Sequence, residues 1–408
     1  MDFEYGIIGG GPAGYTAGML LAQQGHSVVL FESEFLGGTC LNKGCIPTKS
    51  LLHSSEIYKS VINSENIGLD IDVKNFDFKK ISEKKGKTVE KIRKSLELAV
   101  KNSGVKVIYA KAFAKDKTTI VADGNEYKIN KIIYACGSKP KELKGFEFDK
   151  KFILSSDDVL QLDCLPKSVL IIGSGAIGIE WARIFSNFGV EVSIVELANH
   201  LIPLADIDVS KRIERIFKQN KIKFYLNDSV EKIVDKKVIL KSGVEIQPEI
   251  ILSAVGRTPV KPDIDGLIVL GDSAGEIQLA HYAIHQAKQF ALGIDCDVSL
   301  IPSVIYGEPE IAWVGLREQD CGEDCKCVNI PISALGKSWC DDSTEGFIKI
   351  ITKNDLIVGA HIVSKEGSAL IHELLIAIQN KLKISDLKKV CFAHPTYSEG
   401  IFEILLRT

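Results

Sequence analysis

The most informative part of the chain for its architecture is residues 3–32, FEYGIIGGGPAGYTAGMLLAQQGHSVVLFE. The apolar residues 3–8 predict a strand, the glycine-rich residues 9–14 a tight turn, and the next residues a helix to about Gln24. A second strand then ends at Glu32. Glycines in such a turn let the backbone approach a pyrophosphate at the helix N-terminus, while the acid can accept a hydrogen bond from a ribose hydroxyl. The glycine spacing alone would be weak, but in this context it predicts a dinucleotide-binding unit.

The same unit occurs a second time. Residues 169–172 predict a strand, 173–178 the glycine turn, 179–187 a helix and 192–195 a strand closed by Glu196. The step from first glycine to acid is 23 positions in both copies, Gly9 to Glu32 and Gly173 to Glu196. The chain therefore binds two dinucleotides or has one site duplicated. No arginine follows Glu196 to receive a 2′-phosphate, so the second unit favours NAD over NADP.

Eight residues beyond the first acid, the chain reaches two cysteines in residues 37–49, GGTCLNKGCIPTK. Residues 50–60 have helical periodicity, and Pro47 suits the first turn of that helix, so Cys45 should lie at a helix N-terminus. There the backbone N–H groups favour a thiolate. A short loop that returns Cys40 to Cys45 makes a reversible disulfide plausible. The alternative is two inert thiols, and the spacing is not that of common zinc sites.

Size and charge narrow the class of protein. A chain of 408 residues should hold two to four domains, and a net charge of −3 gives no reason to expect nucleic acid or a membrane surface as partner. The acidic N-terminus does not have the pattern of a signal peptide, and no apolar run has the length of a membrane span. We expect a cytoplasmic setting, where thiols stay reduced unless a disulfide is catalytic.

The middle of the chain contributes further strand ends. Residues 132–138 and 250–256 predict buried strands that end near Gly137 and Gly256. Residues 268–272 predict a strand with Asp272 at its carboxyl end, where α/β sheets place ligand groups. A helix from residue 279 to 291 follows, and its His281 is either a ligand contact or a structural cap.

From residue 301 onward the pattern is that of an α+β domain. Its apolar helix, residues 366–380, suits subunit packing. His394 precedes Glu399 by five residues, which is either a plain turn or an imidazole oriented by a carboxylate for proton transfer. The spacing of Cys321, Cys325 and Cys327 is unlike that of common zinc sites, so we expect no metal there.

Taken in order, both glycine units, the cysteine stretch, residues 301–310 (IPSVIYGEPE) and the His394 segment resemble the FAD-dependent pyridine nucleotide–disulfide oxidoreductases, most closely the dihydrolipoamide dehydrogenases. The resemblance implies an α/β chain with two Rossmann-like domains, for FAD and NAD, and a C-terminal α+β dimerisation domain. The implied divisions are a first part of the FAD domain (1–145), an NAD domain (146–260), a shortened central segment that contacts FAD (261–298) and a dimerisation domain (299–408).

Site roles also follow from the resemblance. Cys45 would be the thiolate beside the flavin, Cys40 the exchanging thiol, Lys49 and Glu180 an ion pair near the flavin, and His394 with Glu399 the acid/base acting across a dimer interface. FAD would be held by Gly9, Gly11, Pro12, Ala13, Gly14, Glu32, Gly38, Thr39, Lys49, Gly137, Asp272, Leu279, Ala280 and His281. NAD would be held by Gly173, Gly175, Ile177, Gly178, Glu196 and Gly256.

The implied activity is oxidation of dihydrolipoamide, with electrons passing through the cysteine pair and FAD to NAD. The implied partners are a second copy of the chain and the lipoyl domains of 2-oxo acid dehydrogenase complexes or of the glycine cleavage system. Only 13 residues separate Arg257 from Gly271, fewer than is usual in the family, and Cys136, Val260 and Phe392 replace common residues. Two alternatives remain open: a reductase of another small disulfide, and a degenerate flavoprotein that serves in assembly.

Overall fold

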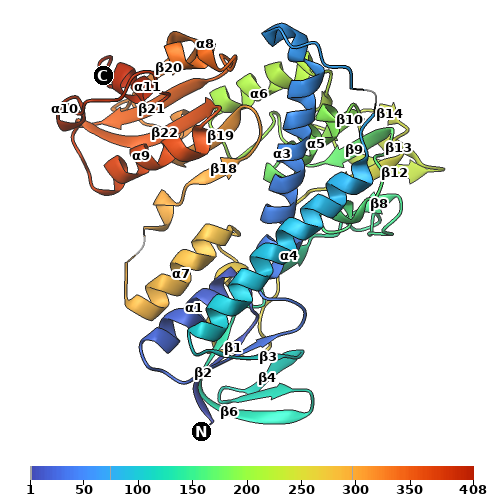
Figure 1. Ribbon diagram of the computed structural model, residues 1–408, viewed down its shortest axis with the longest axis vertical. Helices are drawn as coiled ribbons and strands as arrows, with labels where there is room; N and C mark the ends of the chain where they lie inside the picture. The colour runs from blue at the N-terminus through green and yellow to red at the C-terminus, as the bar shows by residue number, and fades with distance from the viewer. Residues whose placement is uncertain (1, 74, 296) are drawn as a thin grey trace.

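The computed structural model describes residues 2–73, 75–295 and 297–408 (Figure 1). The first glycine unit folds as expected: β1 (Phe3–Ile8), α1 (Pro12–Gln23) and the parallel strand β2 (Val28–Glu32). These strands join a sheet of order β3-β2-β1-β6-β5-β4. Its other strands are β3 (Lys106–Tyr109), β4 (Ala112–Asp116), β5 (Thr119–Ala122) and β6 (Asn125–Tyr134). Ile7 pairs with Leu30 on one side and Ile133 on the other, which puts β1 at the buried centre.

The second unit has the same topology in a separate sheet of order β11-β10-β9-β15-β8. Its strands β9 (Ser168–Ile172) and β10 (Glu191–Val195) are parallel and flank α5 (Ala176–Asn187). The rest of the unit comprises β8 (Ile153–Leu154), α6 (Ile207–Gln219), β11 (Lys223–Tyr225), β15 (Ile250–Ser253) and a three-stranded sheet of β12 (Val230–Val234), β13 (Lys237–Leu240) and β14 (Glu245–Ile246).

The shortened central segment returns the chain to the first sheet. Strand β16 (Arg257–Pro259) pairs with β7 (Ser138–Pro140), and β17 (Ile268–Val269) pairs with β6. The strand predicted over residues 268–272 is longer than the observed strand β17. Gly271 has a φ of +68°, outside the range of a strand, and Asp272 lies in a 3₁₀ turn. Helix α7 (Ala280–Leu292) then packs its Ala283 and Ala287 with Ala13 and Ala17 of α1.

Two long helices connect the parts of the molecule. Helix α3 (Cys45–Ile62) packs against α5 and α4 (Phe78–Asn102), and its Leu51 and Leu52 share a buried core with Trp181 of α5. In Figure 1, α3 lies between the second unit and the C-terminal sheet, while α4 crosses toward the first. The expected loop between the two cysteines is wrong: residues from Gly38 to Lys43 form the short helix α2 (Gly38–Lys43), which contains Cys40.

The C-terminal part is an antiparallel sheet of order β18-β19-β22-β21-β20 covered by helices. Helix α9 (Gly367–Gln379) buries Leu370, Ile371 and Leu374 against this sheet, while Ile376 is 58% exposed on the opposite side. The strands are β18 (Ser303–Ile305), β19 (Glu310–Gly315), β20 (Lys326–Pro331), β21 (Phe347–Lys353) and β22 (Leu356–Ser364), and the remaining helices are α8 (Gly336–Cys340), α10 (Ile384–Leu387) and α11 (Glu399–Leu405).

A buried lysine joins this sheet to the second unit. The Lys349 ammonium lies 2.8 Å from Asp206 Oδ1 and 2.8 Å from Asp208 Oδ2, at the start of α6, and also bonds to Glu318. Burial would lower the pKa of Lys349, but the hydrogen bonds to the three carboxylates outweigh it and raise that pKa. Because the ammonium already compensates these carboxylates, the cluster gives no reason to propose a metal there.

We expect Lys349→Met to lower the free energy of unfolding by ~3–5 kcal/mol, because it leaves the fully buried Asp206 carboxylate unpaired. Urea unfolding followed by circular dichroism measures the change. The matched control is Lys353→Met on the same strand, whose exposed ion pair with Asp324 should be worth less than ~1 kcal/mol. Equal midpoints for the two variants would contradict the prediction.

In the described part of the chain, no helix is both long and apolar enough to cross a membrane.

Candidate active site

The two cysteines of residues 37–49 come together at the junction of α2 and α3. Cys40 lies in α2, and Cys45 is the first residue of α3, as the helical periodicity predicted. A Cβ on Gly44, the residue between the helices, would lie 3.0 Å from the Thr39 carbonyl oxygen, so a glycine lets the chain fold back tightly. Both residues are free cysteines, and each side chain shifts the pKa of the other.

The two thiols differ in acidity. The hydrogen bond from Cys40 lowers the pKa of Cys45 to about 7, against the effect of burial, and the nearby Lys49 ammonium contributes in the same direction. The same hydrogen bond, together with burial, raises the pKa of Cys40. In the reduced pair, Cys45 is therefore the more acidic thiol, and Cys40 is the partner that stays protonated at neutral pH.

Lys49 and Glu180 form a part-buried ion pair near these thiols, although 131 positions separate them. Lys49 Nζ lies 2.8 Å from Glu180 Oε1 and 2.7 Å from Oε2, and Glu180 is 4% exposed. The Tyr306 N–H donates to Glu180 Oε1 at 3.1 Å, and the Tyr306 ring lies 4.7 Å from Lys49 Nζ. The structure thus brings together the two residues that the sequence predicted as a pair, and adds Tyr306.

The first glycine turn has the geometry of a phosphate cradle. Gly9 has a φ of +104°, and any Cβ on Gly14 would overlap the Gly9 carbonyl, so neither position accepts a side chain. Gly11 precedes α1 and leaves the helix N-terminus without a side-chain cap. Glu32 accepts hydrogen bonds from the Gly10 and Glu34 N–H groups, both at 2.8 Å, which fixes its carboxylate at the turn. These residues fit a dinucleotide whose pyrophosphate lies on α1.

The second glycine turn repeats this arrangement. Gly173 has a φ of +97°, and a Cβ on Gly175 would meet no atom within 4 Å, so open space lies before the uncapped N-terminus of α5. Glu196 Oε2 accepts from the Ser174 N–H at 2.8 Å and from Ser174 Oγ at 2.7 Å. Ile177 and Gly178, the other predicted residues of this turn, lie in the first turn of α5. The turn fits a second dinucleotide.

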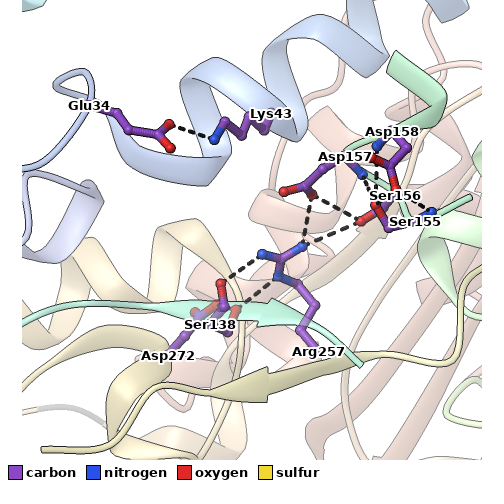
Figure 2. A network of polar contacts seen from close by, with 9 residues as sticks. All are labelled: Glu34, Lys43, Ser138, Ser155, Ser156, Asp157, Asp158, Arg257 and Asp272. Carbon is purple, nitrogen blue, oxygen red and sulfur yellow. Dashed lines mark hydrogen bonds and ion pairs between the residues drawn. The ribbon is translucent and has the colours of Figure 1, made fainter. Parts of the chain in front are cut away.

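The predicted residues around the central segment meet through Arg257 (Figure 2). Arg257 donates to the Ser138 carbonyl at 2.8 Å and to Ser138 Oγ at 2.9 Å, and it lies 3.4 Å from Asp157. Ser138 Oγ in turn donates to Asp272 Oδ2 at 2.5 Å. Figure 2 shows this chain of contacts running from β16 through β7 to Asp272. Asp272 is thereby held near Gly137, whose carbonyl accepts from Ser273 Oγ at 3.3 Å.

At the start of α7, the side chain of His281 contacts the main chain of a later segment. The ring of His281 makes a hydrogen bond with the Pro302 carbonyl at 2.8 Å, and Leu279 precedes the helix without a side-chain cap. The His281 side chain therefore ties α7 to the following segment. The main-chain groups of Leu279, Ala280 and His281, which were predicted to contact FAD, remain available to a ligand at this helix N-terminus.

His394 and Glu399 also meet, but not beside the thiols. His394 Nδ1 lies 2.8 Å from Glu399 Oε1, and the Thr396 N–H donates to Glu399 Oε2 at 2.9 Å. These two contacts, the backbone one first, lower the pKa of Glu399. The His394 side chain is 76% exposed, and in Figure 1 α11, which Glu399 begins, lies well away from the N-terminus of α3. Within one subunit the imidazole therefore points to solvent, not to Cys40 and Cys45.

Other cysteines lie outside this constellation. Burial, with a hydrogen bond to Cys325, raises the pKa of Cys321 to about 12, so this thiol stays protonated at neutral pH. Cys136 points its sulfur at the Ile8 carbonyl, 3.6 Å away, and burial raises its pKa. Neither residue has the lowered pKa that distinguishes Cys45.

Sequence reasoning missed one residue of the site, Arg183. It follows Glu180 by one helical turn and is 6% exposed, yet it lies in the otherwise apolar run from Trp181 to Phe185. A cation on the buried face of a helix was the available signal, since such charges are rarely buried without a partner.

The comparisons with known proteins agree with this geometry. Residues 3–293 match the pyridine nucleotide-disulphide oxidoreductase family, and residues 301–404 match the dimerisation domain of the same family. The chain is 31% identical to a dihydrolipoyl dehydrogenase of Chlamydia pneumoniae, over 98% of this chain and 95% of that one. It is 33% identical to the mitochondrial dihydrolipoyl dehydrogenase of Pisum sativum, over 98% and 90% of the two chains. The crystal structure of LpdA from Mycobacterium tuberculosis has the same fold, with a TM-score of 0.91, 22% identity and 99% coverage of both chains.

The chain belongs to the pyridine nucleotide-disulphide oxidoreductase family. The predicted fold class and family resemblance are thereby confirmed. The protein is a flavoprotein oxidoreductase that resembles the dihydrolipoyl dehydrogenases, and its family uses FAD and NAD(H). The match over residues 301–404 supports the predicted homodimer.

Proposed function

We propose that this protein oxidises dihydrolipoamide with NAD⁺, through thiol–disulfide exchange at Cys40 and Cys45. The observation that carries the proposal is the thiol pair at the start of α3, where Cys45 has a pKa of about 7 and lies near the Lys49–Glu180 ion pair. Similarity to dihydrolipoyl dehydrogenases over nearly the whole chain supports the substrate. The partners that we propose are lipoyl domains of 2-oxo acid dehydrogenase complexes or of the glycine cleavage system.

The reaction starts from a Cys40–Cys45 disulfide. One thiolate of dihydrolipoamide attacks Cys40 Sγ, the disulfide bond breaks, and Cys45 leaves as a thiolate. The second thiolate of the substrate then attacks the other substrate sulfur, which is bonded to Cys40 in the mixed disulfide. This step releases cyclic lipoamide and the Cys40 thiolate. Cys45 is the better leaving group because its pKa is the lower of the two.

Other residues of the chain support these two exchanges. Lys49 compensates the charge that develops on Cys45, and Glu180 fixes the position of that ammonium. We assign to His394, oriented by Glu399, the role of accepting protons from the substrate thiols. Because the His394 side chain points to solvent in its own subunit, we place this pair at the thiols of the other subunit. The two glycine turns would hold FAD and NAD, and bound FAD would carry electron pairs between the thiols and NAD.

A substrate panel tests the proposal. The purified holoprotein is assayed with free dihydrolipoamide and NAD⁺, and with NADH or NADPH against low-molecular-weight disulfides such as glutathione disulfide and cystine. Turnover that is highest with dihydrolipoamide and NAD⁺ supports the proposal. Preference for another disulfide would favour the alternative reductase, and a colourless or redox-silent protein would favour a degenerate assembly subunit.

We expect NAD⁺ to be preferred over NADP⁺, because the Glu196 carboxylate at the second turn would repel a 2′-phosphate. In Glu196→Gln the amide keeps an acceptor for the Ser174 N–H but loses the charge. The loss of a charged hydrogen bond should raise KM for NAD⁺ by ~10-fold or more and narrow the preference over NADP⁺. Steady-state kinetics with both nucleotides measure the ratio, and a ratio equal to that of the wild type would contradict the prediction.

A further inference from the structure

Arg183 is a buried cation one helical turn from Glu180, and the reaction described above does not use it. Its Nη1 donates to the carbonyl of Tyr306 at 3.0 Å and to that of Pro309 at 2.8 Å. Its Nη2 is buried and makes no hydrogen bond with the described residues. Carboxylates approach it from α3 (Glu56), from α5 (Glu180) and from β19 and the loop before it (Glu310 and Glu308). A guanidinium placed so deeply must stabilise something nearby to offset the cost of its burial.

The loop that Arg183 binds is the one that holds the Lys49–Glu180 pair. Tyr306 is fixed at three points: its carbonyl accepts from Arg183, its N–H donates to Glu180, and its ring packs against Lys49. Because Glu180 and Arg183 lie one helical turn apart on α5, both reach this loop from the same face. A series of direct contacts thus connects Arg183 through Tyr306 and Glu180 to Lys49. The Lys49 ammonium stabilises the Cys45 thiolate.

Gly307 provides the space that the arginine needs. Its φ is +134°, a conformation that L side chains rarely adopt, and any Cβ there would overlap the Arg183 guanidinium. The loop therefore accommodates Arg183 only because it has a glycine directly after Tyr306. Arg183 and Gly307 therefore depend on each other sterically, although they are 124 positions apart in the sequence.

We propose that Arg183 is a positioning residue for the thiol chemistry: by clamping the loop from Tyr306 to Pro309, it holds the Glu180–Lys49 pair in place beside Cys45. The proposal rests on the proposed role of Cys45 as the thiolate of the pair, but not on the identity of the substrate. A merely structural arginine would stabilise the packing of this loop on α5 and leave the acidity of Cys45 unchanged.

The test reads the acidity of Cys45 directly. The reduced holoprotein is treated with iodoacetamide between pH 5 and pH 9, and mass spectrometry follows alkylation of the tryptic peptide of residues 44–49, which contains Cys45 but not Cys40. The groups that set this profile are Cys40 on α2, Lys49 on α3 and Glu180 on α5. Glu56, whose pKa burial raises to about 7, and Lys59 on α3, with Glu308 and Glu310, set the charge around Arg183 itself.

In Arg183→Met we expect the apparent pKa of Cys45 to rise by about one unit, which lowers the alkylation rate at pH 6 by ~10-fold. Arg183→Lys keeps the charge and one donor, and should recover part of that rate. The matched control is Arg212→Met, which removes the part-buried pair with Glu345, 3.1 Å away, and should leave the Cys45 profile unchanged. A folded Arg183→Met protein with the wild-type profile would overturn the proposal, even if its melting temperature fell.

Gly307→Ala is a second test, needed if Arg183→Met does not fold. The alanine variant keeps the Arg183 charge but displaces the guanidinium. It should shift the Cys45 profile in the same direction, and a folded variant with an unchanged profile would overturn the proposal. In the double variant Arg183→Met/Gly307→Ala, the alanine should have a smaller effect than in the wild type. A failure of the proposed function, seen as no turnover of dihydrolipoamide by the wild type, would leave all of these comparisons intact.

Discussion

Cys45→Ser is expected to abolish the oxidation of dihydrolipoamide, with a loss in kcat of ~10³-fold or more, as for other residues that act as one covalent unit. Serine has nearly the size of cysteine and can keep the contact with Cys40, but its hydroxyl cannot form the disulfide and does not ionise at neutral pH. The variant should still bind FAD, because the glycine turn from Gly9 to Gly14 is unchanged. On reduction it should lack the long-wavelength absorption band that a thiolate beside the flavin produces.

The control for this prediction is Cys136→Ser, since that thiol is also partly buried near the first sheet but has a raised pKa. It should retain wild-type turnover and the long-wavelength band. More than a tenth of wild-type activity in Cys45→Ser, or persistence of the band, would show that the reactive thiolate is elsewhere.

The second large effect is expected for His394→Gln, which should lower kcat by ~10²–10⁴-fold, the usual contribution of a general acid/base. Glutamine can keep a hydrogen bond to Glu399 but cannot exchange a proton near neutral pH. The control is His26→Gln, since His26 lies 3.4 Å from Glu4 in a similar pair on the surface of the first unit. Steady-state kinetics should show little change for that variant, and an equal loss in both would contradict the assignment.

Mixed dimers test where His394 acts. Subunits with Cys45→Ser retain an intact His394, and subunits with His394→Gln retain an intact thiol pair. If the imidazole serves the thiols of the other subunit, a dimer of one of each has one complete site and should show about half of the wild-type activity. If it serves its own subunit, the mixed dimer has no complete site and should be nearly inactive.

The prediction of the fold succeeded where the determinants are local. The glycine turns at Gly9 and Gly173 require positive φ angles and close backbone contacts, and such requirements are written into short stretches of sequence. Helices α1 and α5 end within one residue of the predicted positions. The errors occurred at the short helix α2 and at the strand before Asp272, where a single turn or one glycine changes the assignment.

The features of the site likewise divide into those predicted from local sequence and those that depend on distant contacts. The acidity of Cys45 was foreseen in part from its position at the start of a helix, but its largest cause is the hydrogen bond from Cys40, which depends on how α2 packs on α3. The role of Arg183 was not visible, because its partners are carbonyl groups more than a hundred residues away. Main-chain acceptors have no signature in the sequence.

The two nucleotide units, the cysteine pair at a helix start and the family could all be recognised before the fold was known, because each depends on residue types at fixed short spacings. Two other sets of long-range contacts became visible only in the folded chain: Lys349 with its three carboxylates, and Arg183 with the loop at Gly307. These contacts join separate elements, so their geometry depends on how the sheets and helices pack against one another. Burial then gives those charged contacts their strength, because removing water from around them raises both the cost of an unpaired group and the benefit of a paired one.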